Sequence, residues 1–177
     1  MINVMIDIET LGTKPGCVVL SIAAVPFLTA APEETFYEKI DPRDCARHGL
    51  LSDPATIAWW NKQDPAIKAE AMSGSNTLHK TLLALTSYLM QLGKPNDIRV
   101  WGNGASFDIP ILEAAYDICK LTPYWKYYNS LCYRTVKAMY PAIPFVAAVD
   151  AHNALEDAKA QAAHMEKIFK HYMLGGI

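Results

Sequence analysis

Apolar and polar side chains alternate over residues 2–9, with isoleucine or valine at every even position. An alternation with a period of two is typical of a β-strand that buries at least one of its faces. Two further apolar stretches, 18–25 and 35–40, are set off by turn sequences that contain proline. The chain is therefore predicted to open with three consecutive strands, joined as a meander.

Helical signals follow the third strand. Asp53 and Asp64 each precede a proline, an order that is typical of a helix start. Asn76 or Thr77 could cap a longer helix, along which five leucines form one stripe and after which Gly93 stands. We expect two short helices and one long helix in this part of the chain.

The second half of the chain alternates between strand and helix signals. Residues 98–101 predict a short strand, and Ser106 could cap the helix that follows it. Ser130 could start another helix that reaches Tyr140, and an apolar stripe over 155–169 predicts a C-terminal helix. This order favours the α/β class, with a mixed sheet flanked by helices.

The composition limits the class of protein. With 177 residues, 51% of them hydrophobic, the chain suits a single domain over 1–177 with one buried core. The formal net charge of −2 provides no global attraction to nucleic acid, whose binding proteins are usually basic. The four cysteines are far apart and predict free thiols, and no leader or membrane-spanning run is evident. We expect a cytoplasmic protein that does not bind membranes.

Two acidic residues lie on one face of the first predicted strand. Asp7 and Glu9 are two positions apart, so both side chains leave the same face. The strand is otherwise apolar and is expected to be central, where two adjacent carboxylates repel each other unless a cation compensates them. The alternative is an exposed edge strand whose polar face carries both acids, and this segment alone does not decide between the two.

Asp108 and Asp157 are further candidates, each near the start of a predicted helix. Asp108 follows a loop with two glycines, which let a backbone approach a ligand closely, and Asp157 follows His152 by five residues. The helix would hold Asp157 rigidly and leave the His152 imidazole free to approach a substrate. Each residue also has an ordinary explanation, because acids in a first turn complement the helix dipole and a histidine there can be a surface residue.

Four carboxylates and one histidine are the groups that phosphodiester hydrolysis needs. Two cations about 3.5–4 Å apart can clamp the attacking and leaving oxygens, and hard oxygen ligands suit Mg²⁺ or Mn²⁺. A free imidazole, whose pKa is about 6.5, is suited to take a proton from the attacking water. Asp7, Glu9, Asp108 and Asp157 are therefore the predicted ligands of two divalent cations, and His152 is the predicted general base.

In combination, these residues resemble the DnaQ-like, or DEDDh, 3′-5′ exonuclease superfamily. The three motifs of that family occur in its order, at 7–10, 103–108 and 152–157, and the histidine five residues before the last aspartate matches the DEDDh branch. Segments 7–13 and 56–63 are similar to a bacterial and phage subgroup that is described as RNase T-like or exonuclease VIII-like. This resemblance covers essentially the whole chain.

The resemblance implies a fold and a division of roles among the acids. The fold would be RNase H-like, a five-stranded mixed β-sheet flanked by α-helices, with the first three strands antiparallel. Asp7 would contact both cations, Glu9 and Asp157 would help to hold the first, and Asp108 would hold the second. His152 would activate the nucleophile.

Contacts with the terminal nucleotide are also implied by the resemblance. The backbone near Thr10 would meet the 3′-OH, and Leu11 would wedge against the base. Phe107 and Asn103 would contact the terminal sugar and base. Capture of a free 3′-OH would make the enzyme an exonuclease.

Two tryptophans and two basic residues are further candidates by residue type. Trp59 and Trp60 point about 100° apart if they lie on a helix, so one is expected in the core and the other in the substrate groove, where a base can stack on it. Trp60 is the residue assigned to the substrate. Arg134 and Lys137 could touch phosphate or belong to a solvated helix face, and the solvated face is favoured for Lys137.

The predicted function is the metal-dependent removal of nucleotides from the 3′ end of a nucleic acid, with RNA or DNA left open. The resemblance implies a bacterial or phage-encoded protein, and homodimers are common among similar proteins. Two alternatives remain: a catalytically silent protein that binds nucleic-acid ends, and an RNase H-type endonuclease. The filled catalytic positions argue against the first, and the spacing of His152 and Asp157 argues against the second.

Overall fold

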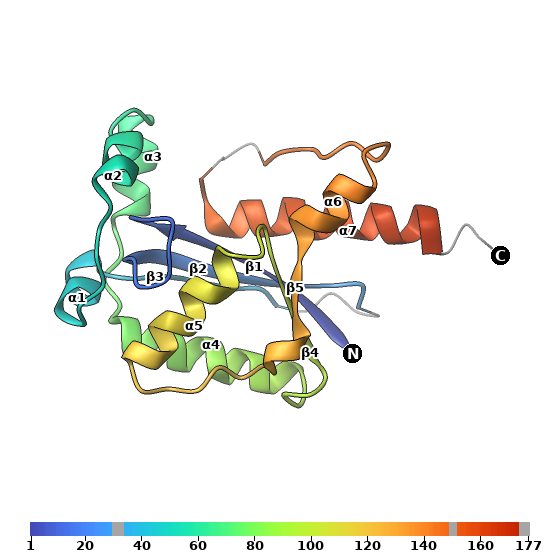
Figure 1. Ribbon diagram of the computed structural model, residues 1–177, viewed down its shortest axis with the longest axis horizontal. Coiled ribbons are helices and arrows are strands. Elements are labelled where there is room, and N and C mark those ends of the chain that lie inside the picture. Colours follow the sequence, from blue (N-terminus) through green and yellow to red (C-terminus); the bar gives the residue numbers. More distant parts are fainter. Residues whose placement is uncertain (30–33, 149–151, 174–177) are drawn as a thin grey trace.

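A computed structural model describes residues 1–29, 34–148 and 152–173 of the chain. Its centre is a five-stranded sheet in the order β3-β2-β1-β4-β5, in which β1, β2 and β3 are antiparallel and β4 and β5 run parallel to β1 (Figure 1). The predicted RNase H-like mixed sheet is confirmed, and the strand that carries Asp7 and Glu9 is its central strand. The strands are β1 (Ile2–Thr10), β2 (Val19–Phe27), β3 (Phe36–Lys39), β4 (Ile98–Gly102) and β5 (Ser130–Cys132).

Helices cover both faces of the sheet (Figure 1). Helices α4 (Leu78–Leu92) and α5 (Asp108–Ile118) lie on one face, and α6 (Tyr133–Met139) and α7 (Ala154–Met173) lie on the other. In the described ranges, no helix combines the length and the apolar character that crossing a membrane requires. Three short helices connect β3 to α4, and a 3-10 turn precedes β5: α1 (Pro42–Arg47), α2 (Pro54–Trp60), α3 (Pro65–Ala71) and η1 (Tyr127–Asn129).

Strand β1 contributes to two hydrophobic clusters, one on each face of the sheet. Val4, Ile6 and Ile8 are buried with the leucines of α4. Met5 is buried with the apolar face of α7. The predicted alternation is therefore confirmed, and packing on both faces prevents β1 from shifting to relieve strain at its acidic end.

Small side chains line the contact between α7 and the sheet. Ala158 and Ala162 of α7 are buried in the same cluster as Ala23 of β2, which is the strand partner of Asp7. Alanines on both sides let the two backbones approach closely, since little side-chain volume separates them. Polar residues on this face of α7 can consequently reach the carboxylates of β1.

Most of the predicted helix ends are confirmed. Asp53, Asp64 and Thr77 each accept a hydrogen bond from a backbone N–H in the first turn of the following helix. Gly93 follows the last residue of α4. The pattern did not predict α1, although Asp41 precedes a proline and caps that helix in the same way.

Two predicted helix starts are wrong. Ser106 does not cap α5, which follows Phe107 without a side-chain hydrogen bond at its cap. Ser130 begins strand β5, because residues 130–132 pair with β4, and α6 begins at Tyr133. Three residues are too few to show a period, so pairing with a distant strand decides their conformation.

Gly102, the last residue of β4, leaves space for the side chain of Asp108. A Cβ at position 102 would lie 2.9 Å from the Asp108 Cβ and 2.8 Å from its Oδ2. We predict that Gly102→Ala lowers the free energy of unfolding by about 1–3 kcal/mol, a typical cost of overpacking, in urea denaturation. Gly93→Ala is the control, because its Cβ would meet the flexible end of the Ile2 side chain. Equal losses in the two variants would contradict the prediction.

Candidate active site

Three carboxylates meet at the C-terminal end of β1. Asp7 and Glu9 leave the same face of the strand, and Asp157 reaches them from the first turn of α7. One oxygen of each side chain lies within 4.8 Å of the others. Asp7 is 8% exposed, so water screens its charge poorly.

Asp108 lies beside these three acids, at the first residue of α5. Its side chain is buried, and its Oδ2 accepts a hydrogen bond of 2.7 Å from the backbone N–H of Asn103. Backbone hydrogen bonds from Ile8 and from Asp108 itself, and the charge of Arg134, also favour its ionised form. The structure therefore brings all four predicted acids to one place.

Burial and mutual repulsion oppose the ionisation of these acids. Burial, together with the charges of Asp108 and Glu9, raises the pKa of Asp7 well above its ordinary value. Burial and the charges of Asp157 and Asp108 raise the pKa of Glu9 to about 8. Burial also raises the pKa of Asp108 to about 6 and raises the pKa of Asp157. A divalent cation would relieve this repulsion, and a set of oxygen donors fits a hard cation.

Gln161 is a buried neighbour of Asp7 that the sequence pattern did not single out. Its Nε2 donates a hydrogen bond of 2.7 Å to Asp7 Oδ1, while its Oε1 has no partner among the described residues. Gln161 lies one turn after Asp157 and thus on the same face of α7. In the sequence, Gln161 is a polar residue within the apolar stripe that Ala158, Ala162 and Met165 form. This interruption is the signal that could have identified it.

His152 is held in front of α7 by its backbone and by its ring. Its φ of 68° lies in the left-handed region, and its backbone N–H donates a hydrogen bond of 3.2 Å to Asp157 Oδ2. Its ring meets Trp59 edge-on, with the ring centroids 4.8 Å apart. Asn153 caps α7 by accepting a hydrogen bond from the N–H of Leu155. The helix start therefore carries the imidazole and the Asp157 carboxylate together.

A pocket of about 500 Å³ adjoins the acids, and its lining includes Glu9, Thr10, Phe107 and both tryptophans. Trp60 is 1% exposed and donates its indole N–H to the carbonyl of Thr10 at 2.9 Å, whereas Trp59 is 41% exposed. One tryptophan is in the core, as predicted, but it is Trp60, the residue assigned to the substrate. Helical spacing alone does not tell which of two adjacent residues faces the core, because that depends on the elements that pack against the helix.

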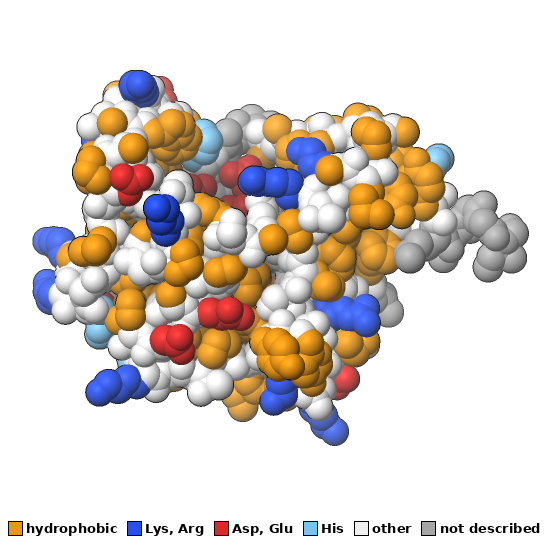
Figure 2. Space-filling view, viewed as in Figure 1, with side chains coloured by type: hydrophobic (Ala, Val, Ile, Leu, Met, Phe, Trp, Pro, Cys, Tyr) orange, Lys and Arg blue, Asp and Glu red, His pale blue; other side chains and the backbone are white. Residues whose placement is uncertain are grey.

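Two of the expected substrate contacts, Leu11 and Asn103, do not line this pocket. Leu11 is 8% exposed and packs in the hydrophobic cluster on the α4 face. Asn103 lines a second pocket of about 620 Å³ together with Arg134, Lys137 and Phe145. Figure 2 shows acidic side chains in a hollow of the surface, with Lys and Arg side chains beside it.

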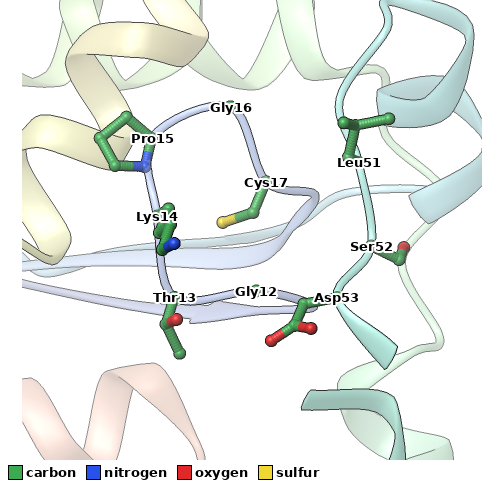
Figure 3. A pocket seen from close by; sticks show the side chains of 9 residues that line it. All are labelled: Gly12, Thr13, Lys14, Pro15, Gly16, Cys17, Leu51, Ser52 and Asp53. Atoms are coloured by element: carbon green, nitrogen blue, oxygen red, sulfur yellow. The ribbon is translucent and has the colours of Figure 1, made fainter. Parts of the chain in front are cut away.

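A third pocket, of about 400 Å³, lies against the turn between β1 and β2 (Figure 3). Residues 12–17 and 51–53 line it, and it shares Gly12, Thr13 and Asp53 with the pocket next to Glu9. The four clustered acids do not line it. The third pocket thus extends the pocket next to Glu9 away from the acidic centre.

Solved exonuclease structures share this fold. E. coli exonuclease I, in complex with a dT13 oligonucleotide, matches with a TM-score of 0.68 and 19% identity over 98% of this chain and 42% of that chain. The nuclease domain of 3′hExo, a DEDDh family member bound to rAMP, matches with a TM-score of 0.64 and 14% identity over 97% of this chain and 92% of that chain. This chain therefore spans about two fifths of the length of exonuclease I. Among curated proteins, no relative matches the chain.

Residues 2–169 match the family described as the 3′-5′ exoribonuclease Rv2179c-like domain. Because this match covers nearly all of the chain, the protein belongs to that family.

We predict that the metal-free protein becomes less stable as the pH rises. In the folded state the pKa of Glu9 is about 8 and the pKa of Asp108 is about 6, both above their ordinary values, so the folded protein binds more protons than the unfolded chain. The resulting stability is fully present below about pH 4 and is lost between about pH 4 and pH 8. Urea denaturation in EDTA measures this decline.

Two variants separate the acidic cluster from other titrating groups. Glu9→Gln should reduce the decline in the free energy of unfolding, because it removes one of the acids whose pKa is raised. Asp117→Asn, at an exposed position of α5, should leave the decline unchanged. An identical pH dependence in wild type and Glu9→Gln would contradict the prediction.

Proposed function

We propose that this chain, as a single domain over 1–177, removes nucleotides one at a time from the 3′ end of RNA in a metal-dependent reaction. The observation that carries the proposal is the convergence of Asp7, Glu9 and Asp157 within 4.8 Å, with Asp108 beside them. Support for RNA comes from the description of the family as 3′-5′ exoribonucleases. Similar folds are known with a DNA oligonucleotide and with rAMP bound.

The four acids would hold two cations, Mg²⁺ or Mn²⁺. Following the family resemblance, Asp7 would contact both, Glu9 and Asp157 the first, and Asp108 the second. When bound, the cations would offset the negative charge of the phosphate and lower the pKa of the attacking water. Hydrogen bonds from Gln161 to Asp7 and from the Asn103 N–H to Asp108 orient these carboxylates without neutralising them.

The pocket beside Glu9 would receive the terminal nucleoside, for which about 500 Å³ is ample. Two hydrogen bonds hold the wall of this pocket in place at Thr10. The Thr10 hydroxyl donates to the Gly12 carbonyl at 2.6 Å, and the Thr10 carbonyl accepts from the indole N–H of Trp60. The rings of Trp59 and Phe107 offer surfaces on which a base or sugar can pack. Trp59 takes the place of Trp60 as the proposed aromatic contact, because its ring is the accessible one.

His152 would take a proton from the attacking water. The water oxygen forms a bond to phosphorus while the P–O3′ bond breaks, and the leaving oxygen takes up a proton from solvent. The products are a nucleoside 5′-monophosphate and a strand with a new 3′-hydroxyl. The ring contact with Trp59 and the backbone bond to Asp157 limit where the imidazole can lie during this transfer.

The state of the cysteines bears on the compartment. Cys17, Cys45, Cys119 and Cys132 are all free thiols, and the first three are buried. A reducing compartment preserves such thiols. We accordingly propose a cytoplasmic enzyme.

Digestion of 5′-labelled RNA and DNA with Mg²⁺ or Mn²⁺ tests the proposed function. We predict a ladder that shortens from the 3′ end, faster on RNA, and no product from RNA with a 3′-phosphate. Asp7→Asn should lower the rate about a thousandfold, because several kcal/mol of charge stabilisation are lost. Cleavage of 3′-blocked RNA would indicate an endonuclease, and binding without cleavage would indicate a silent end-binding protein.

Replacement of His152 tests the general base. We predict that His152→Ala lowers kcat by about 10²–10⁴-fold, the usual contribution of a general base, while the affinity for Mn²⁺ in calorimetry is retained. His79→Ala, at an exposed position of α4, is the matched control and should leave kcat unchanged. An unaltered kcat in His152→Ala would refute the assigned role, and a parallel loss of Mn²⁺ affinity would assign His152 to the cation site instead.

A further inference from the structure

The second pocket is lined by two cationic side chains of one helix. Arg134 and Lys137 of α6 line it, together with Asn103 and Phe145. Within the described ranges, neither cation forms an ion pair with a carboxylate. The Lys137 Nζ lies 4.0 Å from the centre of the Phe145 ring, a contact that fixes the ammonium but leaves its hydrogen-bond donors free. Lys137 therefore lies over an aromatic ring in the lining of this pocket.

The second pocket adjoins the acidic centre through the loop that precedes α5. Asn103 lines this pocket and donates its backbone N–H to Asp108, and the charge of Arg134 lowers the pKa of Asp108. Phe107, from the same loop, lines the pocket beside Glu9. The acids therefore lie between the two pockets.

Buried contacts fix the wall of the second pocket from behind. His164 joins Tyr133 of α6 to the loop after that helix: its Nδ1 lies 2.7 Å from the Tyr133 hydroxyl and its Nε2 lies 2.9 Å from the Ile143 carbonyl. Because a carbonyl can only accept, Nε2 is the donor, and in a neutral imidazole Nδ1 then accepts from the tyrosine. The Phe145 ring packs against both Tyr133 and His164. These contacts hold α6 and the loop after it together, so the wall of the pocket loses little conformational entropy on binding.

We propose that the second pocket binds the sugar-phosphate backbone of the substrate strand on the 5′ side of the scissile bond, with Arg134 and Lys137 each contacting a phosphate. This inference rests on the proposed function, because a strand whose last nucleoside fills the pocket beside Glu9 must continue past the acids. Phosphates recur along such a strand, and cations in a groove are their usual partners. A chain with a net charge of −2 attracts the strand through local positive charge near the site rather than through its overall balance.

The test compares a strand with a substrate that has no strand beyond the scissile bond. The two substrates are an RNA of about eight nucleotides and the p-nitrophenyl ester of a nucleoside 5′-monophosphate. In Arg134→Ala/Lys137→Ala the KM for the RNA should rise about tenfold, and the KM for the ester should change several times less. Lys137→Ala alone should also raise the KM for RNA. This variant leaves the charge of Arg134 near Asp108 in place, so the rise would not come from a change at that acid.

The salt dependence provides a second measurement. Each lost phosphate contact should lower the slope of log KM for RNA against log salt by about 0.7, so the double variant should lose about 1.4. Lys80→Ala/Lys126→Ala is the matched control, because it removes the same charge from exposed positions that line none of the three pockets. Equal RNA KM values and salt slopes in the two double variants would overturn the proposal, as would an equal rise of KM for both substrates.

A measurement of RNA binding without hydrolysis distinguishes failure of the proposed function from failure of the proposed phosphate contacts. Fluorescence anisotropy in Ca²⁺ measures the affinity for the labelled RNA whether or not the enzyme hydrolyses it. If wild type hydrolyses neither substrate, the proposed function fails, and the anisotropy still decides on the second pocket. Weaker binding by Arg134→Ala/Lys137→Ala than by the control variant supports the phosphate contacts, and equal binding overturns them.

Discussion

Repulsion among buried carboxylates is the constraint on which this structure depends. Asp7 belongs to the central strand of the sheet, so it cannot turn outward to water as a residue of an edge strand could. Val4 and Ile6 on one face and Met5 on the other anchor that strand in two hydrophobic clusters. Apolar burial on both faces thus keeps together acids that would separate if they were free. The resulting concentration of negative charge would favour the binding of a small, highly charged cation.

Uncharged hydrogen-bond donors orient the acids, so the negative charge of the carboxylates is left available for a cation. Asp7 accepts from the amide of Gln161, Asp108 from the backbone N–H of Asn103, and Asp157 from the backbone N–H of His152. A lysine or arginine in any of these places would form an ion pair with the acid and compete with a metal for it. Arg134, the cation that does act on Asp108, is set back in the adjoining pocket. The groups that orient the acids are therefore not the groups that neutralise their charge.

The sequence predicts the parts of this structure that rest on local patterns. The period of two in β1 and the Asp-Pro pairs at Asp53 and Asp64 correspond to a strand and to helix starts in the structure. The positions of the acids came from spacing and family resemblance, and the fold brings them together. Other features depend on contacts between distant segments, which no local pattern contains. Strand β5 forms because β4 lies beside it. Trp59 rather than Trp60 is exposed because of the elements that pack against α2. Gln161 becomes a partner of Asp7 because alanines let α7 approach the sheet.

The acids are contributed by opposite ends of the sequence, since Asp7 lies in the first strand and Asp157 in the last helix. During translation, a ribosome exposes β1 long before α7 has been made. A nascent polypeptide therefore lacks the complete set of four acids until α7 has emerged and docked on the sheet. The acidic site is consequently assembled only after the segment that carries Asp157 has been synthesised and folded.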